Sequence, residues 1–175
     1  TEFYNAAQQL SQKPNDNVTR LNFIQRAKDV CTKFNEMSSQ LTSLRRVLVG
    51  DPALPGSLEE SKIFLTCKDL NEKLSDLAEL NKTISASCTQ GSVPNNLLDQ
   101  RDLLLDDISG YLPVTITQGS DNVVNVSFNN IELVKGSYKL GDFKVSSGTT
   151  ANPAVVSFNS GNGINYSTNI TGGKI

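Results

Sequence analysis

The sequence predicts an α+β protein: an elongated antiparallel helical bundle followed by a small antiparallel β domain. Up to about residue 110, apolar residues recur at gaps of three and four, the spacing of one face of an α-helix. From Val114 onward, apolar and polar residues alternate between turns rich in Gly and Asn, as in short antiparallel strands. We therefore expect a helical domain over residues 1–110 and a β domain over residues 111–175.

A first long helix is predicted over residues 17–49. Residues 13–17 supply a helix breaker and capping side chains before it, and Gly50 follows its end. The helix is expected to be about 45 Å long, and one apolar stripe runs along it. The stripe consists of Ile24, Ala27, Cys31, Phe34, Met37, Leu41, Leu44 and Leu48. Such a continuous stripe indicates a helix that packs along most of its length against another element.

A second long helix is predicted over residues 57–89, with Ser57 and Glu60 forming a capping box at its start. Its stripe has alternating gaps of four and three. The members are Ile63, Cys67, Leu70, Leu74, Leu77, Asn81, Ile84 and Cys88. The single polar member, Asn81, either fixes register and partner number in a heptad seam or caps or faces a wet patch. The short link to the first long helix predicts an antiparallel hairpin.

A third, shorter helix is predicted over residues 96–109, within the stretch "PNNLLDQRDLLLDDIS" (residues 94–109). Pro94 precedes it, Asn96 and Asp99 are placed to cap it, and Gly110 follows its end. Its leucine-rich face is expected to pack against the hairpin. This face consists of Leu97, Leu98, Leu104, Leu105 and Ile108.

The same helix carries a cluster of aspartates. Asp99, Asp102 and Asp106 lie at helical spacings, so one face collects three carboxylates. A divalent-ion site would need further oxygen ligands from other elements, and we favour a solvated face relieved by Arg101 and other basic side chains. Asp106 and Asp107 oppose the helix dipole, so we expect them to pair with Arg45 or Arg46. We predict no metal site and no cofactor site.

The composition argues against an enzyme. The chain has no histidine, the commonest general base and metal ligand. Its cysteines, Cys31, Cys67 and Cys88, form no C-x-x-C pair, and the hairpin geometry keeps them too far apart for a disulfide. We therefore predict free core thiols and no catalytic residues. The net charge of −2 gives no broad attraction to nucleic acid or anionic membranes.

Several short strands are predicted in the β domain. They cover residues 114–117, 123–128, 131–134, 137–140, 143–145, 155–158 and 164–166. Val124, Val126 and Phe128 are expected to share one face, since strand side chains alternate. Asn129 with Asn130 marks a turn, and residues 146–150 read as a polar loop.

The stretch of residues 94–109 resembles the signature of the bacterial flagellar hook-associated protein 1 family, the first hook–filament junction proteins. Members carry a pattern like P-N-D-L-L-D-Q-R-D, and Asn96 stands where the family often has Asp. "LNEKLSDLAELNKTI", which precedes this stretch, is similar to a helix pattern of the family, and "NVSFNNIELVKG", which follows it, is similar to a strand pattern of the family. The resemblance covers essentially the whole chain. The family-motif and packing residues are Asn95, Asn96, Leu97, Leu98, Asp99, Gln100, Arg101, Asp102, Leu105, Asn71 and Asn81.

The resemblance implies a structural protein that joins the flagellar hook to the filament as a ring of subunits. It implies an extracellular location after export, unfolded, through the flagellar type III apparatus. The implied partners are other copies of the chain, hook protein, the second junction protein and an export chaperone, with no nucleic acid and no membrane insertion.

By the same resemblance, we expect a fragment that lacks both terminal regions, is monomeric in solution and is truncated at residues 172–175, where the chain would return to the bundle. Two alternatives remain open. One is another axial component, such as the second junction protein or a flagellin-like chain. The other is an extracellular adhesin or glycan-binding module that uses the β half.

Overall fold

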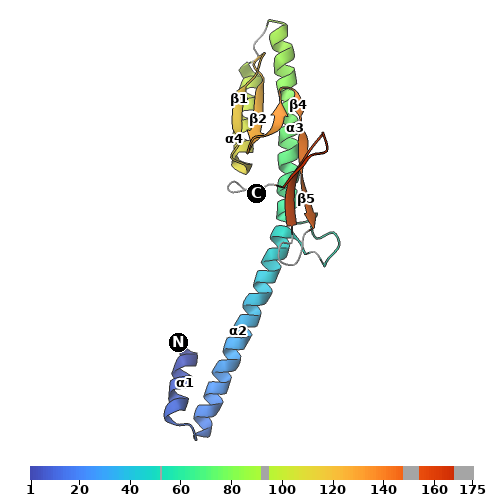
Figure 1. The fold of residues 1–175 in the computed structure, drawn as a ribbon. Coiled ribbons are helices and arrows are strands. Elements are labelled where there is room, and N and C mark those ends of the chain that lie inside the picture. The colour runs from blue at the N-terminus through green and yellow to red at the C-terminus, as the bar shows by residue number, and fades with distance from the viewer. Residues whose placement is uncertain (52, 92–94, 148–153, 168–175) are drawn as a thin grey trace. The chain divides into compact units, whose positions relative to one another are not determined.

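The computed structural model describes residues 1–51, 53–91, 95–147 and 154–167. Within these residues the chain forms four helices followed by seven antiparallel strands, which confirms the predicted α+β class (Figure 1). Three predicted features lie outside the described residues: the break at Pro94, the loop at 148–150 and the return at 172–175. Within the described residues, the helices lack the combination of length and apolar character that crossing a bilayer requires.

The chain divides into two compact units, Thr1–Arg46 and Val47–Ile175. The predicted domain boundary at residue 110 falls inside the second unit, and a division at that point stays a prediction.

The first unit contains α1 (Glu2–Gln12) and most of α2 (Asn17–Val49), whose bounds match the predicted helix. The rings of Phe3 and Phe23 lie 5.3 Å apart, and Glu2 forms an ion pair with Arg26 at 2.8 Å. At the start of α2 the Asp16 carboxylate accepts a hydrogen bond from the Thr19 N–H at 2.9 Å. Residues 13–16 therefore separate α1 from α2, and Asp16 caps the start of α2, as the sequence predicts.

The apolar stripe of α2 is exposed. None of residues 17–49, all of which the structure describes, is buried, and Phe34 and Leu41 are 67% and 64% exposed. Strands and α4 cover the buried side of the second long helix. The predicted antiparallel hairpin of the two long helices stays a prediction.

α3 (Lys62–Thr89) begins five residues later than predicted. Ser61 is its N-cap, with the Ser61 hydroxyl accepting from the Phe64 N–H at 3.4 Å. The Ser57 hydroxyl instead bonds to the N–H and C=O of Asp51, within the turns that connect the two helices. The capping box at Ser57 was therefore wrong, because this serine is used to close the connection.

α4 (Asn95–Tyr111) runs antiparallel to α3. Two cross-helix contacts fix this direction: the Tyr111 hydroxyl donates to Asp69, and Lys73 Nζ lies 2.8 Å from the Asp107 carboxylate. The leucine-rich face packs as predicted, with Leu105 and Ile108 buried against the core. Helix α4 begins at Asn95, so Asn96 lies in its first turn and does not precede it.

The strands form two sheets, where the sequence predicted one β unit. The first has the order β1 (Thr115–Gln118), β2 (Val124–Phe128), β3 (Ile131–Lys135), β4 (Tyr138–Lys139). The second has the order β5 (Gly141–Ser147), β6 (Ala154–Ser160), β7 (Asn165–Ser167). The chain passes between them at Gly141, where an added Cβ would lie 2.1 Å from the Asn159 carbonyl oxygen. Only glycine allows this close approach.

Two hairpin turns use asparagine and aspartate at positive φ. Asn129 and Asn130 have φ values of 47° and 64°, and Asp121 and Asn122 have values of 54° and 57°. Two-residue hairpins of type I′ require positive φ at both central positions, which Asn and Asp tolerate better than other non-glycine residues. The predicted turn at Asn129–Asn130 is therefore confirmed.

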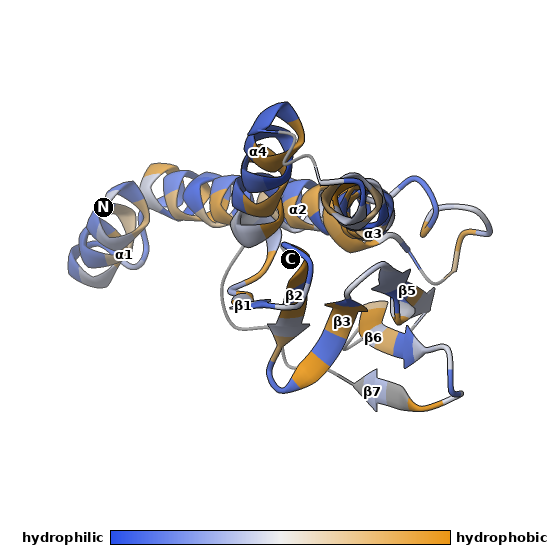
Figure 2. Ribbon diagram, turned by 90° about the horizontal axis from the view of Figure 1, so that it is seen from above, coloured by the Kyte–Doolittle hydropathy of each residue, from blue (hydrophilic) through white to orange (hydrophobic). Residues whose placement is uncertain are grey.

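One hydrophobic core joins α3, α4 and both sheets, and both sheets lie on the same side of α3 (Figure 2). Val124, Val126 and Phe128 all face it, as predicted. Its buried members are Cys67, Leu70, Leu74, Leu77, Ala78, Leu105, Ile108, Leu112, Val124, Val126, Phe128, Leu133, Val134, Phe143 and Phe158. The heptad-like stripe of α3 thus packs on strands and on α4.

Candidate functional site

The main polar feature of the core is the Asn81 side chain, which is fully buried on α3. Its amide nitrogen donates to the carbonyl oxygens of Val124 and Gly136, both at 2.8 Å, and its oxygen accepts from the Val124 N–H at 3.2 Å. The pairing of β2 with β3 ends at Val126 and Val134. Just past this end, the Asn81 side chain bonds to the backbone of both strands' continuations, at Val124 and at Gly136. Asn81 therefore fixes strands on a helix, which neither interpretation of the sequence anticipated.

Asn71 makes a second contact of the same kind, ten residues and about 15 Å earlier on α3. Its amide nitrogen donates to the Phe143 carbonyl and its oxygen accepts from the Phe143 N–H, both at 2.8 Å. Phe143 belongs to β5, so Asn71 holds the second sheet as Asn81 holds the first. Val124 and Phe143 are each 3% exposed, so each asparagine side chain satisfies backbone groups of a buried residue.

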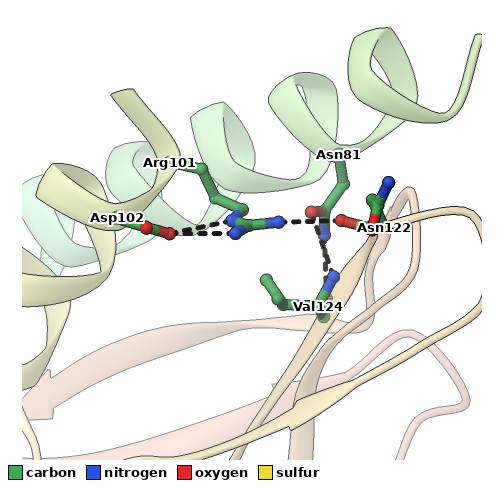
Figure 3. A network of polar contacts seen from close by, with 5 residues as sticks. All are labelled: Asn81, Arg101, Asp102, Asn122 and Val124. Atoms are coloured by element: carbon green, nitrogen blue, oxygen red, sulfur yellow. Dashed lines mark hydrogen bonds and ion pairs between the residues drawn. The ribbon is translucent and has the colours of Figure 1, made fainter. Parts of the chain in front are cut away.

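Arg101 connects α4 to the β1–β2 turn. Its Nη1 donates to the Asn122 carbonyl at 2.7 Å, while Nε and Nη2 donate to Asp102 at 3.1 and 3.0 Å (Figure 3). Arg101 is 9% exposed, and a buried charge needs a partner. The Asp102 carboxylate, which forms an ion pair with Arg101, provides that partner. Figure 3 shows Asn81 and Arg101 directed at neighbouring residues of the same hairpin, from two different helices.

The acidic side chains of α4 do not converge with other metal ligands. Asp99, Asp102 and Asp106 are exposed, and no group of three or more His, Cys, Asp or Glu side chains in the described part of the chain is arranged to hold a metal ion. Asp107 pairs with Lys73, whose amine pKa is raised chiefly by that hydrogen bond. The predicted pairing of Asp106 and Asp107 with Arg45 or Arg46 stays a prediction.

The three cysteines are free thiols, as predicted, but the predicted core position is wrong for Cys31, which is exposed, while Cys67 is buried and Cys88 is half-buried. Burial raises the pKa of the Cys67 thiol to about 11, so it stays protonated at neutral pH. Only a thiolate is strongly nucleophilic, which makes Cys67 a packing residue.

The predicted motif residues fall into two groups. Arg101, Leu105, Asn71 and Asn81 contact the strands or the core, and Leu97 and Leu98 are half-buried beside them. The remaining members are exposed: Asn95, Asn96, Asp99, Gln100 and Asp102. Sequence reasoning missed Asn125, whose side chain accepts from the Gly136 N–H at 2.7 Å, and Lys139, which pairs with Asp142 at 2.6 Å. Asn125 shares the polar side of an alternating strand with Ser127, so no signal in the sequence set it apart.

The chain is similar to known proteins in sequence and in fold. The family model "Flagellar hook-associated protein FlgK helical domain" matches residues 1–175. A "Flagellar hook-associated protein 1" of Bacillus subtilis (strain 168) is 31% identical over 115 residues, which are 66% of this chain and 20% of that protein.

A solved structure, of "the flagellar hook junction protein FlgK from Burkholderia pseudomallei", has the same fold. It superimposes with a TM-score of 0.74 at 20% identity, over 98% of this chain and 30% of that chain. The chain therefore spans between a fifth and a third of the length of these relatives.

Proposed function

The chain belongs to the FlgK helical-domain family of flagellar hook-associated proteins, and on that premise we propose that it is part of a structural protein joining the flagellar hook to the filament. The joint is a ring of subunits, each contributing one copy of this fold. The observation that carries the proposal is the family match over residues 1–175.

The geometry supports a structural role. The buried side chains of Asn81 and Arg101 and the half-buried one of Asn71 are engaged in fixing strands to helices. A satisfied buried polar network specifies one arrangement of its elements, because any shift leaves polar groups without partners. A joint that transmits torque between two assemblies needs such a fixed arrangement of its parts.

The same proposal covers location and partners. The protein lies outside the cell, in the flagellum, after unfolded export through the flagellar type III apparatus. It contacts other copies of itself, the hook protein and the second junction protein, and an export chaperone binds the full-length chain before export. Free thiols are compatible with this route, since no disulfide has to form.

Deletion of the full-length gene tests the proposal. Electron microscopy is expected to show hooks without filaments, while the filament subunit accumulates in the medium. Re-expression of the wild-type gene is the control and restores filaments. Filaments on the deletion strain would overturn the proposal, and intact filaments with lost surface adhesion would favour the adhesin alternative.

A further inference from the structure

The two sheets are attached to the rest of the second unit by unequal sets of contacts. The strand side chains of the first sheet that are buried in the core are Val124, Val126, Phe128, Leu133 and Val134. In the second sheet, Phe143 and Phe158 are the buried ones among the side chains that the structure describes. Burial of apolar area is the main favourable term when one element packs on another, so the second sheet is the more weakly attached.

The hydrogen bonds between α3 and the second sheet meet at one residue of β5. The Asn71 side chain bonds to both the N–H and the C=O of Phe143, each at 2.8 Å. Lys139 of β4 also reaches β5, through an ion pair with Asp142 at 2.6 Å. Both of these charged side chains are partly exposed, and such pairs contribute little to stability. We call the two hydrogen bonds between Asn71 and Phe143 the β5 latch.

The second sheet is also separate from the first in its strand pairing. Among the described residues, β5, β6 and β7 pair with one another and with no strand of the first sheet. Leu140, between β4 and β5, links the sheets: its N–H donates to the Leu133 carbonyl at 2.8 Å, and its carbonyl accepts from the Gly161 N–H at 2.7 Å. A rotation of the chain at Leu140 therefore moves the second sheet without breaking its own ladder.

The packing of β5 on α3 is incomplete. A cavity of about 340 Å³ lies between them, and the residues that line it include Phe64, Cys67, Asn71, Phe143 and Val145. Side chains that line a cavity lack contacts on that side, so this interface gains less dispersion energy than a close-packed one. Cys67 is 2% exposed, so a reagent reaches its thiol when β5 leaves α3.

We propose that the second sheet opens from α3 as one unit, about Leu140, while α3, α4 and the first sheet keep their arrangement. Local openings cost less free energy than global unfolding, and the parts with the fewest buried apolar contacts open first. The β5 latch sets the population of the open state, because its two bonds break when Phe143 leaves α3. This conformational property goes beyond the proposed function and does not depend on it.

Thiol labelling of Cys67 tests the opening. A chain with Cys31→Ser and Cys88→Ala keeps Cys67 as its one thiol, and dithiobis(nitrobenzoate) reports the reaction by absorbance. Labelling is expected to depend on urea with a smaller slope than global unfolding does, because opening exposes less surface. Hydrogen exchange followed by mass spectrometry is expected to give peptides of β5 and β6 the same opening free energy. Peptides of β2 and β3 are expected to exchange through global unfolding.

Substitutions on α3 test the latch in the same background. Asn71→Ala removes both bonds and is expected to speed Cys67 labelling by about 10–100-fold. Glu72→Ala, at an exposed neighbouring position, is the matched control and is expected to leave the labelling rate unchanged. Asn81→Ala removes bonds to the first sheet, so it is expected to lower the urea midpoint of global unfolding without speeding the labelling in the absence of urea.

Three outcomes would overturn the proposal. A labelling slope equal to that of global unfolding, with all segments exchanging together, would show that the second sheet does not open by itself. Labelling of Asn71→Ala no faster than that of Glu72→Ala would exclude the latch. Equal acceleration by Asn81→Ala would show that the two sheets open together. If Asn71→Ala does not fold, the urea slope and the hydrogen exchange of the starting chain decide. None of these outcomes depends on the gene-deletion phenotype.

Discussion

Replacing Asn81 with leucine is expected to destabilise the second unit, although leucine fits the apolar spacing of α3 better. The substitution removes three hydrogen bonds, to Val124 N–H, Val124 C=O and Gly136 C=O. Val124 is 3% exposed, so water cannot replace its two lost bonds. A chain in which Asn81 lay in a helix–helix seam would instead gain stability from leucine.

The magnitude follows from the groups left unpaired. Each unsatisfied group of Val124 costs about 1–3 kcal/mol, whereas Gly136 is half-buried and partly recovers solvent. The buried leucine returns about 1.5–3 kcal/mol. At the midpoints of these ranges the two Val124 groups cost about 4 kcal/mol and leucine returns about 2 kcal/mol, so the net loss is about 2 kcal/mol. This loss lowers Tm by about 4–8 °C in a chain of this size.

Urea unfolding followed by circular dichroism measures this loss. Lys82→Leu is the matched control: it places the same new side chain at an exposed neighbouring position of α3 and is expected to change stability by less than about 0.5 kcal/mol. Asn81→Asp keeps the size but turns a carboxylate oxygen toward two carbonyls, so it is expected to be at least as damaging at pH 7. An Asn81→Leu chain as stable as wild type would refute the argument.

Three further predictions use other contacts. Arg101→Met removes the donor to the Asn122 carbonyl and is expected to cost about 1 kcal/mol by the same unfolding assay, since water can reach the exposed Asn122, whereas equal stability would show that this bond does not hold the turn. Cys67, with its raised pKa, is expected to resist iodoacetamide at pH 8 while exposed Cys31 reacts, as peptide mass mapping would show. Because the folded thiol titrates above the unfolded value of about 9, stability is expected to fall as pH rises through 9 to 11, and a flat profile would contradict this. Asn129→Val is expected to lower Tm and Asn129→Gly to leave it nearly unchanged, since φ is 47° there; equal melting curves would exclude backbone strain as the reason for Asn.

Much of the local structure could be predicted because it depends on neighbours in sequence. The bounds of α2 follow from helical spacing, the core-facing side of β2 from strand alternation, and the turn at Asn129–Asn130 from turn chemistry. The start of α3 could not be predicted in this way. Ser57 and Ser61 both suit an N-cap, and the difference arose from the bonds of Ser57 to Asp51 across the connection.

The sequence by itself determined which face of each helix and strand is apolar, because such faces repeat with the period of the element, but the apolar face of α2 is exposed and that of α3 is buried. Only the tertiary structure decided what covers those faces. The stripe of α3 has the same spacing whether its partner is a helix or a sheet, so Asn81 pointed to a helical seam until the backbone of β2 was placed against it. Long-range partners such as Asn71 with Phe143 and Arg101 with Asn122 depend on how the chain folds back, and spacing along the sequence carries no record of that.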